Sequence, residues 1–132
     1  GALLFLSLGP LAALATRPDY VLCDGQGLAH PRRFGLACHL GVLTDLPTVG
    51  VAKRRLCGEY EAPGVERGAQ SALMDRGERI GTVLRTRRAV SPLFVSVGHR
   101  MTLPGAVSLV LACTPRFRLP ETTRQAHRLA SG

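Results

Sequence analysis

The sequence predicts an α/β fold in which helices flank a mixed sheet. Two apolar runs of strand length, at residues 20–23 and 48–52, enclose a stretch with helical periodicity. A strand, a helix and a second strand form a βαβ unit, so these two strands are expected to be parallel. Residues 78–85 and 93–97 follow as the strands of a hairpin, which makes the sheet mixed. The 132 residues suffice for a single domain with a real core, so residues 1–132 are taken as one domain.

The N-terminal half supplies the βαβ unit. Residues 1–14 are apolar but interrupted by a Gly-Pro pair, which predicts a broken helix. A strand over 20–23 follows, and then a helix that starts at His30 or Pro31 and runs to about Thr44. The buried face of this helix is predicted to consist of Phe34, Ala37, Cys38, Gly41 and Val42.

The C-terminal half begins with residues 54–77, which are rich in Gly, Pro and charge and predict a long surface excursion. A basic loop over 86–92 joins the two hairpin strands. Thr102 is a suitable cap for a helix over 103–113, which is apolar almost all round and is expected to be well buried. A last helix begins near Leu119 and carries Arg124, His127 and Arg128.

The chain is strongly basic, with 17 Lys and Arg against 9 Asp and Glu, for a net charge of +8. This excess favours an anionic partner, of which nucleic acid is the first candidate. Aromatic residues make up only 5% of the chain, which disfavours a stacking platform for single strands.

The four cysteines form no C-x-x-C pair, so neither a zinc ribbon nor a redox motif is indicated. Cys23, Cys38 and Cys113 lie in apolar runs and are expected in the core, which fits a reducing, cytoplasmic compartment. The N-terminal apolar run is too short to span a bilayer comfortably, and no membrane partner is expected. A signal peptide stays as an alternative, because residues 13–15 mimic a signal-peptidase site, although an initiator Met and a basic start are missing.

Asp24 and Lys53 are the first candidate functional residues. Each directly follows one of the two parallel strands, and parallel strands end at the same edge of a sheet, where open α/β sheets place their ligands. Glycines at positions 25 and 27 let backbone approach a ligand, and Arg32 and Arg33 add positive charge. An acid in these surroundings suggests metal-assisted phosphate chemistry, whereas the simpler alternative is a plain Asp-Gly turn.

Four long stretches closely resemble the endonuclease V family. The first two are Asp24–Ala37, reading DGQGLAHPRRFGLA, and His39–Lys53. The other two are Pro92–Arg100, reading PLFVSVGHR, and Arg116–His127. The resemblance runs from about Pro18 to the C-terminus with few gaps.

The resemblance implies a ribonuclease-H-like fold and a metal-dependent endonuclease of DNA repair. The implied reaction cuts the second phosphodiester on the 3′ side of inosine, in DNA and in some members in RNA, with Mg²⁺ or Mn²⁺. The implied partner is therefore DNA containing deoxyinosine, with single-stranded RNA as an alternative, and the full-length protein is expected to be monomeric. The deaminated base must leave the stack, which costs about a few kcal/mol. Inosine pairs weakly, so its extrusion is easier than that of a normally paired base.

The resemblance also implies roles for particular residues. Asp24 matches a carboxylate metal ligand, Lys53 the lysine that faces the reacting phosphate, and His30 a histidine near the site. His127 falls where members carry a His or Asp implicated in metal binding. The base pocket corresponds to Gly25, Gly27, Gly35 and Leu36. Candidate contacts to the nucleic-acid backbone are Arg32, Arg33 and Arg100, together with Arg85, Arg87 and Arg88.

Several of these residues have a simpler interpretation. His30 is equally well explained as a helix cap or as a residue behind the site, and His127 as a solvated residue of a basic helix. His39 and His99 are taken as structural. The arginines are as readily explained as solvated surface.

The family's other carboxylates have no counterpart here. In the family, one of them lies on a first strand that would be upstream of Gly1. The next is a Glu in a segment that reads like G-x-L-x-F-R-E, and Ser7 stands at its position here. The chain thus reads as an incomplete, N-terminally truncated endonuclease V domain lacking its first strands, and Asp24 with His127 should bind metal weakly. The alternative function is an inactive ribonuclease-H-like module that only binds nucleic acid. An exposed sheet edge predicts poor solubility or self-association.

Overall fold

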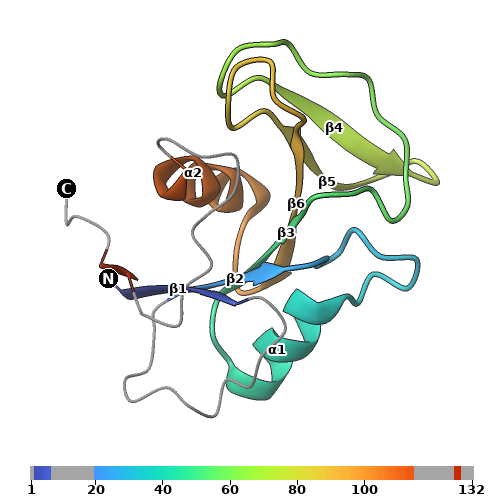
Figure 1. Cartoon of the computed structure of the whole chain (residues 1–132). Helices are drawn as coiled ribbons and strands as arrows, with labels where there is room; N and C mark the ends of the chain where they lie inside the picture. Colours follow the sequence, from blue (N-terminus) through green and yellow to red (C-terminus); the bar gives the residue numbers. More distant parts are fainter. Residues whose placement is uncertain (1, 7–19, 115–126, 129–132) are drawn as a thin grey trace.

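The structure is a computed structural model that describes residues 2–6, 20–114 and 127–128. Its seven-stranded sheet has the order β4-β5-β6-β3-β2-β1-β7, and α1 and α2 lie on opposite faces of it (Figure 1). The predicted α/β fold with a mixed sheet flanked by helices is confirmed. The elements are β1 (Ala2–Leu6), β2 (Tyr20–Asp24), α1 (Leu36–Thr44), β3 (Thr48–Ala52), β4 (Gln70–Asp75), β5 (Glu78–Leu84), β6 (Leu93–His99), α2 (Leu103–Cys113) and β7 (His127–Arg128).

The predicted βαβ unit is present as β2, α1 and β3. The two strands are parallel, and Asp24 at the end of β2 pairs with Val51 near the end of β3. Strand β6 runs antiparallel to β3 and pairs Phe94 with Ala52. The start of β6, and with it the loop over 86–92, therefore lies at the same sheet edge as Asp24 and Lys53.

The predicted surface excursion over 54–77 is wrong in its last third, where β4 forms and pairs antiparallel with β5. The two strands are joined by Arg76 and Gly77, whose φ angles are 51° and 76°. Positive φ at both central positions is the mark of a type I′ hairpin turn, whose usual signals are Asn-Gly and Asp-Gly. The turn was not predicted because Arg76 occupies the first central position, where Asn or Asp is the usual signal.

The predicted helix at the N-terminus is also wrong, because residues 2–6 form β1, which runs parallel to β2. Periodicity does not separate a short buried strand from a buried helix, so the five-residue apolar run was ambiguous. The predicted last helix is corrected at residues 127–128, which form β7 and pair antiparallel with β1. The rest of both predicted helices, including Ser7, lies outside the described residues.

Helix α1 begins at Leu36, five or six residues later than predicted. Residues 30–33 form turns and bends instead, with Arg33 in the left-handed region at φ 57°. The helix buries Ala37, Cys38 and Gly41 against the sheet, as predicted. Val42, in contrast, is 60% exposed, and Phe34 lies before the helix and is 39% exposed.

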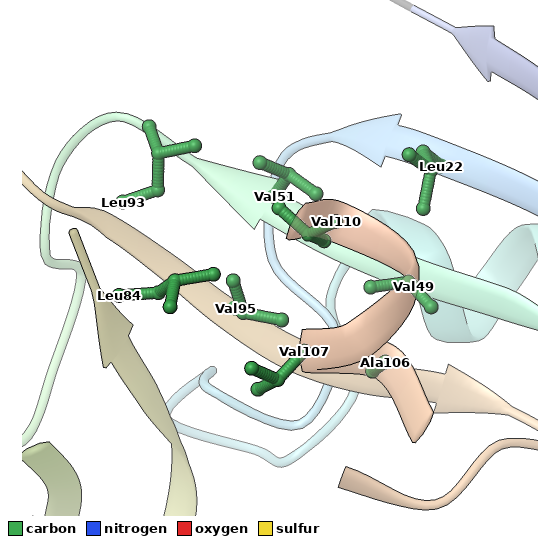
Figure 2. Packing of buried hydrophobic residues seen from close by; sticks show 9 residues of the cluster. All are labelled: Leu22, Val49, Val51, Leu84, Leu93, Val95, Ala106, Val107 and Val110. Atoms are coloured by element: carbon green, nitrogen blue, oxygen red, sulfur yellow. The ribbon is translucent and has the colours of Figure 1, made fainter. Parts of the chain in front are cut away.

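Helix α2 matches its predicted bounds, and the Thr102 side chain accepts a hydrogen bond from the backbone N–H of Gly105. It buries one face only, so the expected burial all round is wrong. A helix that lies on one sheet face has solvent on its other side. The buried face packs on strands β2, β3, β5 and β6 in the main core (Figure 2), which consists of Leu22, Val49, Val51, Leu84, Leu93, Val95, Ala106, Val107 and Val110.

Cys23 and Cys38 are buried as expected, whereas Cys113 is only partly buried. All four cysteines are free thiols. Within the described residues, no helix combines the length and the apolar character that crossing a membrane requires.

Candidate functional site

Residues 25–35, here called the glycine loop, connect β2 to α1 and pass over β3 and β6 on the sheet face that α1 covers. The loop is held by backbone hydrogen bonds from Gly25 N to Val51 O at 3.1 Å and from Leu28 N to Val97 O at 2.8 Å. Gly27 N also donates to the buried Ser96 Oγ at 2.8 Å. The loop is therefore fixed to both β3 and β6, the strands beside the predicted site.

The four predicted pocket residues divide into two kinds. A Cβ on Gly27 would lie 2.2 Å from Val97 O, and one on Gly35 would lie 2.4 Å from Gln26 O. These two glycines are needed because the loop packs against the protein's own backbone. A Cβ on Gly25 would meet only the Leu36 side chain, at an ordinary 3.5 Å. Gly25 and Leu36 thus adjoin, and of the glycines in this set only Gly25 has room beside it.

Gly50 belongs to the same arrangement and was missed in the sequence. A Cβ at this position of β3 would lie 2.4 Å from Gly27 N, because the glycine loop rests directly on the strand. A glycine inside an otherwise apolar strand is the available signal, since it often marks close approach of another backbone.

The N-terminus of α1 is also built on the loop. Gly35 N donates to Gly27 O at 3.0 Å, and Ala37 N donates to Gln26 O at 3.0 Å. No side chain caps the helix at Gly35. The loop carbonyls therefore satisfy N–H groups that a helix leaves open at its start.

Asp24 and Lys53 lie at one sheet edge, as the parallel strands require. Asp24 is partly exposed at the end of β2, and Lys53 is exposed directly after β3. Alternation along β2 places Asp24 on the sheet face of Leu22, and Lys53 follows the end of β3. Exposed arginines continue this edge on either side of the pair, namely Arg54, Arg55 and Arg87. Arg88 is also exposed, but its Nε lies 2.8 Å from Glu66 Oε1 in an ion pair.

Gln26 links the glycine loop to the backbone that follows β3, and it was not singled out in the sequence. Its side-chain Nε2 donates to Arg54 O at 3.1 Å, one residue beyond Lys53. Its Oε1 is buried and accepts no hydrogen bond from the described residues. The bond ties the backbone that follows Lys53 to the glycine loop.

His30 lies in the glycine loop with a defined hydrogen bond. Its Nδ1 accepts from the backbone N–H of Arg32 at 3.1 Å. Only an unprotonated Nδ1 accepts, so the neutral ring carries its proton on Nε2. Nε2–H is thus a donor that an anion can use, which suits a residue near a phosphate.

The predicted phosphate-contacting arginines fall in different places. Arg32 is exposed beside His30. Arg33 instead forms ion pairs with Asp75 at 2.9 Å and Glu78 at 3.0 Å. Its hydrogen bond to Asp75 raises the pKa of its guanidinium. Arg85 is used internally, where it donates to the carbonyls of Gly64, Val90 and Pro63.

Arg100 lies at the opposite sheet edge from Asp24. It follows His99, which pairs with Thr48 at the start of β3. Arg100 Nη1 is 3.2 Å from one oxygen of Asp45, and His99 Nε2 is 3.0 Å from the other. His99 is thus in a structural contact, as expected, and the structure does not bring Arg100 together with Lys53.

His127 is placed by its backbone alone. In the sheet register it pairs with Leu3, which pairs with Tyr20 at the start of β2. Four residues of strand separate this level from Asp24, or roughly 13 Å. The structure therefore does not bring the backbones of these two residues together.

A metal centre is not complete within the described residues. No three His, Cys, Asp or Glu side chains of that part of the chain gather as a potential site. Mg²⁺ is usually held by one or two carboxylates together with waters and substrate phosphates. Asp24 can supply one such carboxylate, so the described residues hold one ligand of a centre and not a complete one.

Comparison with known proteins agrees with the long motifs. The family model described as Endonuclease V matches residues 6–128. Endonuclease V of Nostoc punctiforme is 55% identical over 124 residues, which cover 94% of this chain and 56% of that protein. The chain thus spans about half the length of the curated relatives that it matches.

Solved structures of the same kind share the fold. Endonuclease V from Streptomyces avermitilis is 54% identical with a TM-score of 0.82, over 86% of this chain and 50% of that one. Endonuclease V of Ciona intestinalis, solved with DNA containing an inosine followed by a ribo-adenosine, is 31% identical with a TM-score of 0.66. That match covers 80% of this chain and 50% of the Ciona chain. The mixed sheet is accordingly ribonuclease-H-like.

Proposed function

Because the chain belongs to the endonuclease V family, we propose that it forms the part of an endonuclease that reads an inosine base and faces the reacting phosphate. The observation that carries this proposal is the position of the glycine loop. Gly25, the glycine with room beside it, directly follows Asp24, and its N–H donates to Val51 O, two residues before Lys53. A base beside the loop would therefore have its phosphates near Lys53.

The loop suits hypoxanthine because its backbone is open beside Gly25. Hypoxanthine carries an O6 acceptor where adenine carries an exocyclic amine, so a backbone N–H favours the deaminated base. The N–H groups of Gly25, Gly27, Gly35 and Ala37 already donate to protein acceptors. We assign the O6 contact to the N–H of Leu36, at the open start of α1, where a helix leaves donors unsatisfied.

The proposed reaction is hydrolysis of the second phosphodiester on the 3′ side of inosine. Lys53 would contribute a positive charge to the phosphate in the transition state. His30 would donate from Nε2, and Arg32 would contact a neighbouring phosphate. We propose Mg²⁺ or Mn²⁺ as the cofactor, with Asp24 as one carboxylate ligand.

The proposed substrate is DNA that contains deoxyinosine, with RNA as an alternative. The net charge of +8 and the exposed arginines around Lys53 support a polyanionic partner. The proposed compartment is the reducing cytoplasm, which the four free thiols support.

The test is cleavage of an inosine-containing oligonucleotide in Mg²⁺ or Mn²⁺. The chain is expected to cut it, Asp24→Asn to be inactive, and Asp45→Asn, a carboxylate change at the opposite sheet edge, to keep the activity. Mn²⁺ affinity measured by calorimetry should fall in Asp24→Asn alone. Cutting that survives Asp24→Asn would refute the assignment of Asp24.

A second candidate function is a module that binds nucleic acid without cutting it. The incomplete metal centre among the described residues favours it. It predicts binding that weakens steeply with salt and ignores inosine, with no cleavage in either metal.

A further inference from the structure

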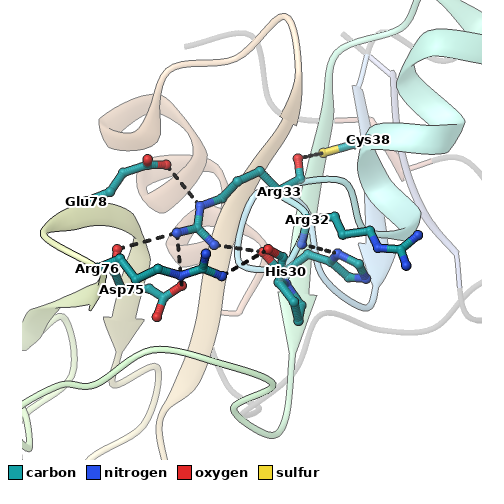
Figure 3. A network of polar contacts seen from close by, with 8 residues as sticks. His30, Arg32, Arg33, Cys38, Asp75, Arg76 and Glu78 are labelled. Carbon is teal, nitrogen blue, oxygen red and sulfur yellow. Dashed lines mark hydrogen bonds and ion pairs between the residues drawn. The ribbon is translucent and has the colours of Figure 1, made fainter.

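The Arg33 side chain forms ion pairs with the β4–β5 hairpin. Its Nη2 lies 2.9 Å from Asp75 Oδ2 and its Nε lies 3.0 Å from Glu78 Oε1 (Figure 3). The side chain is only 23% exposed. A phosphate that approached this guanidinium would also meet two carboxylates, so Arg33 is poorly suited to bind one.

The same guanidinium holds its own loop. Arg33 Nη1 donates to His30 O at 2.9 Å, and the backbone N–H of Arg33 donates to the same oxygen at 2.8 Å. Arg33 adopts φ 57°, which L-residues other than Asn and Asp seldom do. These contacts fix the turn from His30 to Arg33 and join it to the hairpin.

The hairpin is a suitable anchor. Asp75 and Glu78 are paired on either side of its two-residue turn, so their carboxylates are presented together. The turn residue Arg76 also donates to Pro31 O at 3.4 Å, a second link between hairpin and glycine loop. Both strands of the hairpin continue the sheet beyond β6, so the anchor is part of the rigid fold.

Arg33 is also connected onward to the pocket. Its carbonyl accepts a weak hydrogen bond from Cys38 Sγ in α1 at 3.9 Å. Gly35, two residues later, donates to Gly27 O. A shift of Arg33 would therefore move both the start of α1 and the glycines that shape the loop.

We propose that Arg33 is a positioning residue. It links the glycine loop to the β4–β5 hairpin and so sets the geometry of the base pocket. The role rests on the proposed function, since it concerns how the same pocket discriminates inosine. Arg33 thereby differs from its exposed neighbour Arg32, which is available to a phosphate.

The experiment compares Arg33→Gln with Arg32→Gln in the full chain. Affinities for inosine- and adenosine-containing oligonucleotides are measured over a range of salt in EDTA, so that no strand is cut. Arg33→Gln should lower the inosine-to-adenosine affinity ratio by roughly 2- to 30-fold, the range for residues that act through another element. The slope of log affinity against log salt concentration (the salt slope) should equal that of the parent chain. Arg32→Gln should keep the ratio and make the slope shallower by about 0.7–0.9.

Hydrogen exchange supplies a readout without nucleic acid. Exchange of the Gly27 and Gly35 amides should accelerate in Arg33→Gln and stay unchanged in Arg32→Gln. If Arg33→Gln folds poorly, Glu78→Gln serves instead, because it removes one partner whose side chain is 61% exposed. It should change the ratio and the exchange in the same direction, to a smaller degree.

Three results would overturn the proposal: a shallower salt slope with an unchanged ratio in Arg33→Gln, an equal loss of affinity for both oligonucleotides, or unchanged exchange at Gly27 and Gly35. A parent chain that does not distinguish inosine from adenosine would count against the proposed function instead. In that case the exchange data alone decide whether Arg33 positions the loop.

Discussion

Gly27→Ala and Gly25→Ala are expected to act on different properties of the protein, although the two glycines are separated by one residue. A methyl group on Gly27 would lie 2.2 Å from Val97 O and 2.7 Å from Val97 C, which are backbone atoms of a central strand. The loop must then move away from β6. That movement breaks the hydrogen bonds from Gly27 N to Ser96 Oγ and from Leu28 N to Val97 O.

The cost of Gly27→Ala follows from these contacts. Overpacking in a filled interior costs about 1–3 kcal/mol. The two broken hydrogen bonds cost about 1 kcal/mol each. The free energy of unfolding should therefore fall by about 3–5 kcal/mol, a large part of the roughly 5–15 kcal/mol that stabilises an ordinary domain.

Gly25→Ala is the matched control. Its methyl group would make an ordinary contact with Leu36, and its φ is not in the left-handed region, so stability should change by no more than about 0.5 kcal/mol. The methyl group would, however, narrow the space beside Leu36 and weaken binding of an inosine-containing oligonucleotide.

Urea unfolding followed by circular dichroism measures both variants, with the midpoint reporting stability at a constant slope. A loss of less than about 1 kcal/mol in Gly27→Ala, below the overpacking range, would contradict the close contact with Val97. The distinction between the two glycines would fail if Gly25→Ala were as destabilising as Gly27→Ala.

Three further predictions concern stability. Burial raises the pKa of the Cys23 thiol from 9.0 to about 12, so the folded state keeps a proton that the unfolded chain loses, and this thiol should lower stability by about 1.4 kcal/mol per pH unit between these values. Cys23→Ala should remove this contribution and leave that of Cys113, whose thiol pKa burial raises to about 11, as pH-dependent urea unfolding can check. Thr102→Ala should cost about 1 kcal/mol in thermal unfolding, because the N–H of Gly105 loses its cap. Val42→Gln should change stability by no more than about 0.5 kcal/mol despite the helical pattern that assigned Val42 to the core, and a larger loss would contradict its exposure.

The sequence was sufficient for the elements that depend on local pattern and on connection rules. The runs at 20–23 and 48–52 with a helix between them fix a parallel pair, and that pair places Asp24 and Lys53 at one edge. The cap at Thr102 was predictable because its side chain bonds locally.

Other elements depend on contacts between distant residues. Strand β4 exists because it pairs with β5 across a turn whose Arg76 gives no hairpin signal. The late start of α1 reflects Arg33, whose left-handed conformation is held by Asp75 and Glu78, 42 and 45 residues away. Single-sequence patterns contain no information on such partners.

The site shows the same division. The motif around Asp24 indicated that Gly25, Gly27 and Gly35 permit close approach, but not what approaches them. For Gly27 and Gly35 the approaching group is the protein's own backbone, and only Gly25 of the three has room beside it. Arg33 and Arg100 looked equivalent to Arg32 in the sequence, yet both have carboxylate partners in the fold.

The central claim is that the glycine loop reads the inosine base. Its most direct test is the change in amide chemical shifts of the isotope-labelled chain on adding an inosine-containing oligonucleotide in EDTA, compared with its adenosine counterpart. We expect inosine-specific changes in chemical shift concentrated at Gly25, Gln26 and Leu36. Changes of equal size with both oligonucleotides, or changes confined to the exposed arginines, would contradict it.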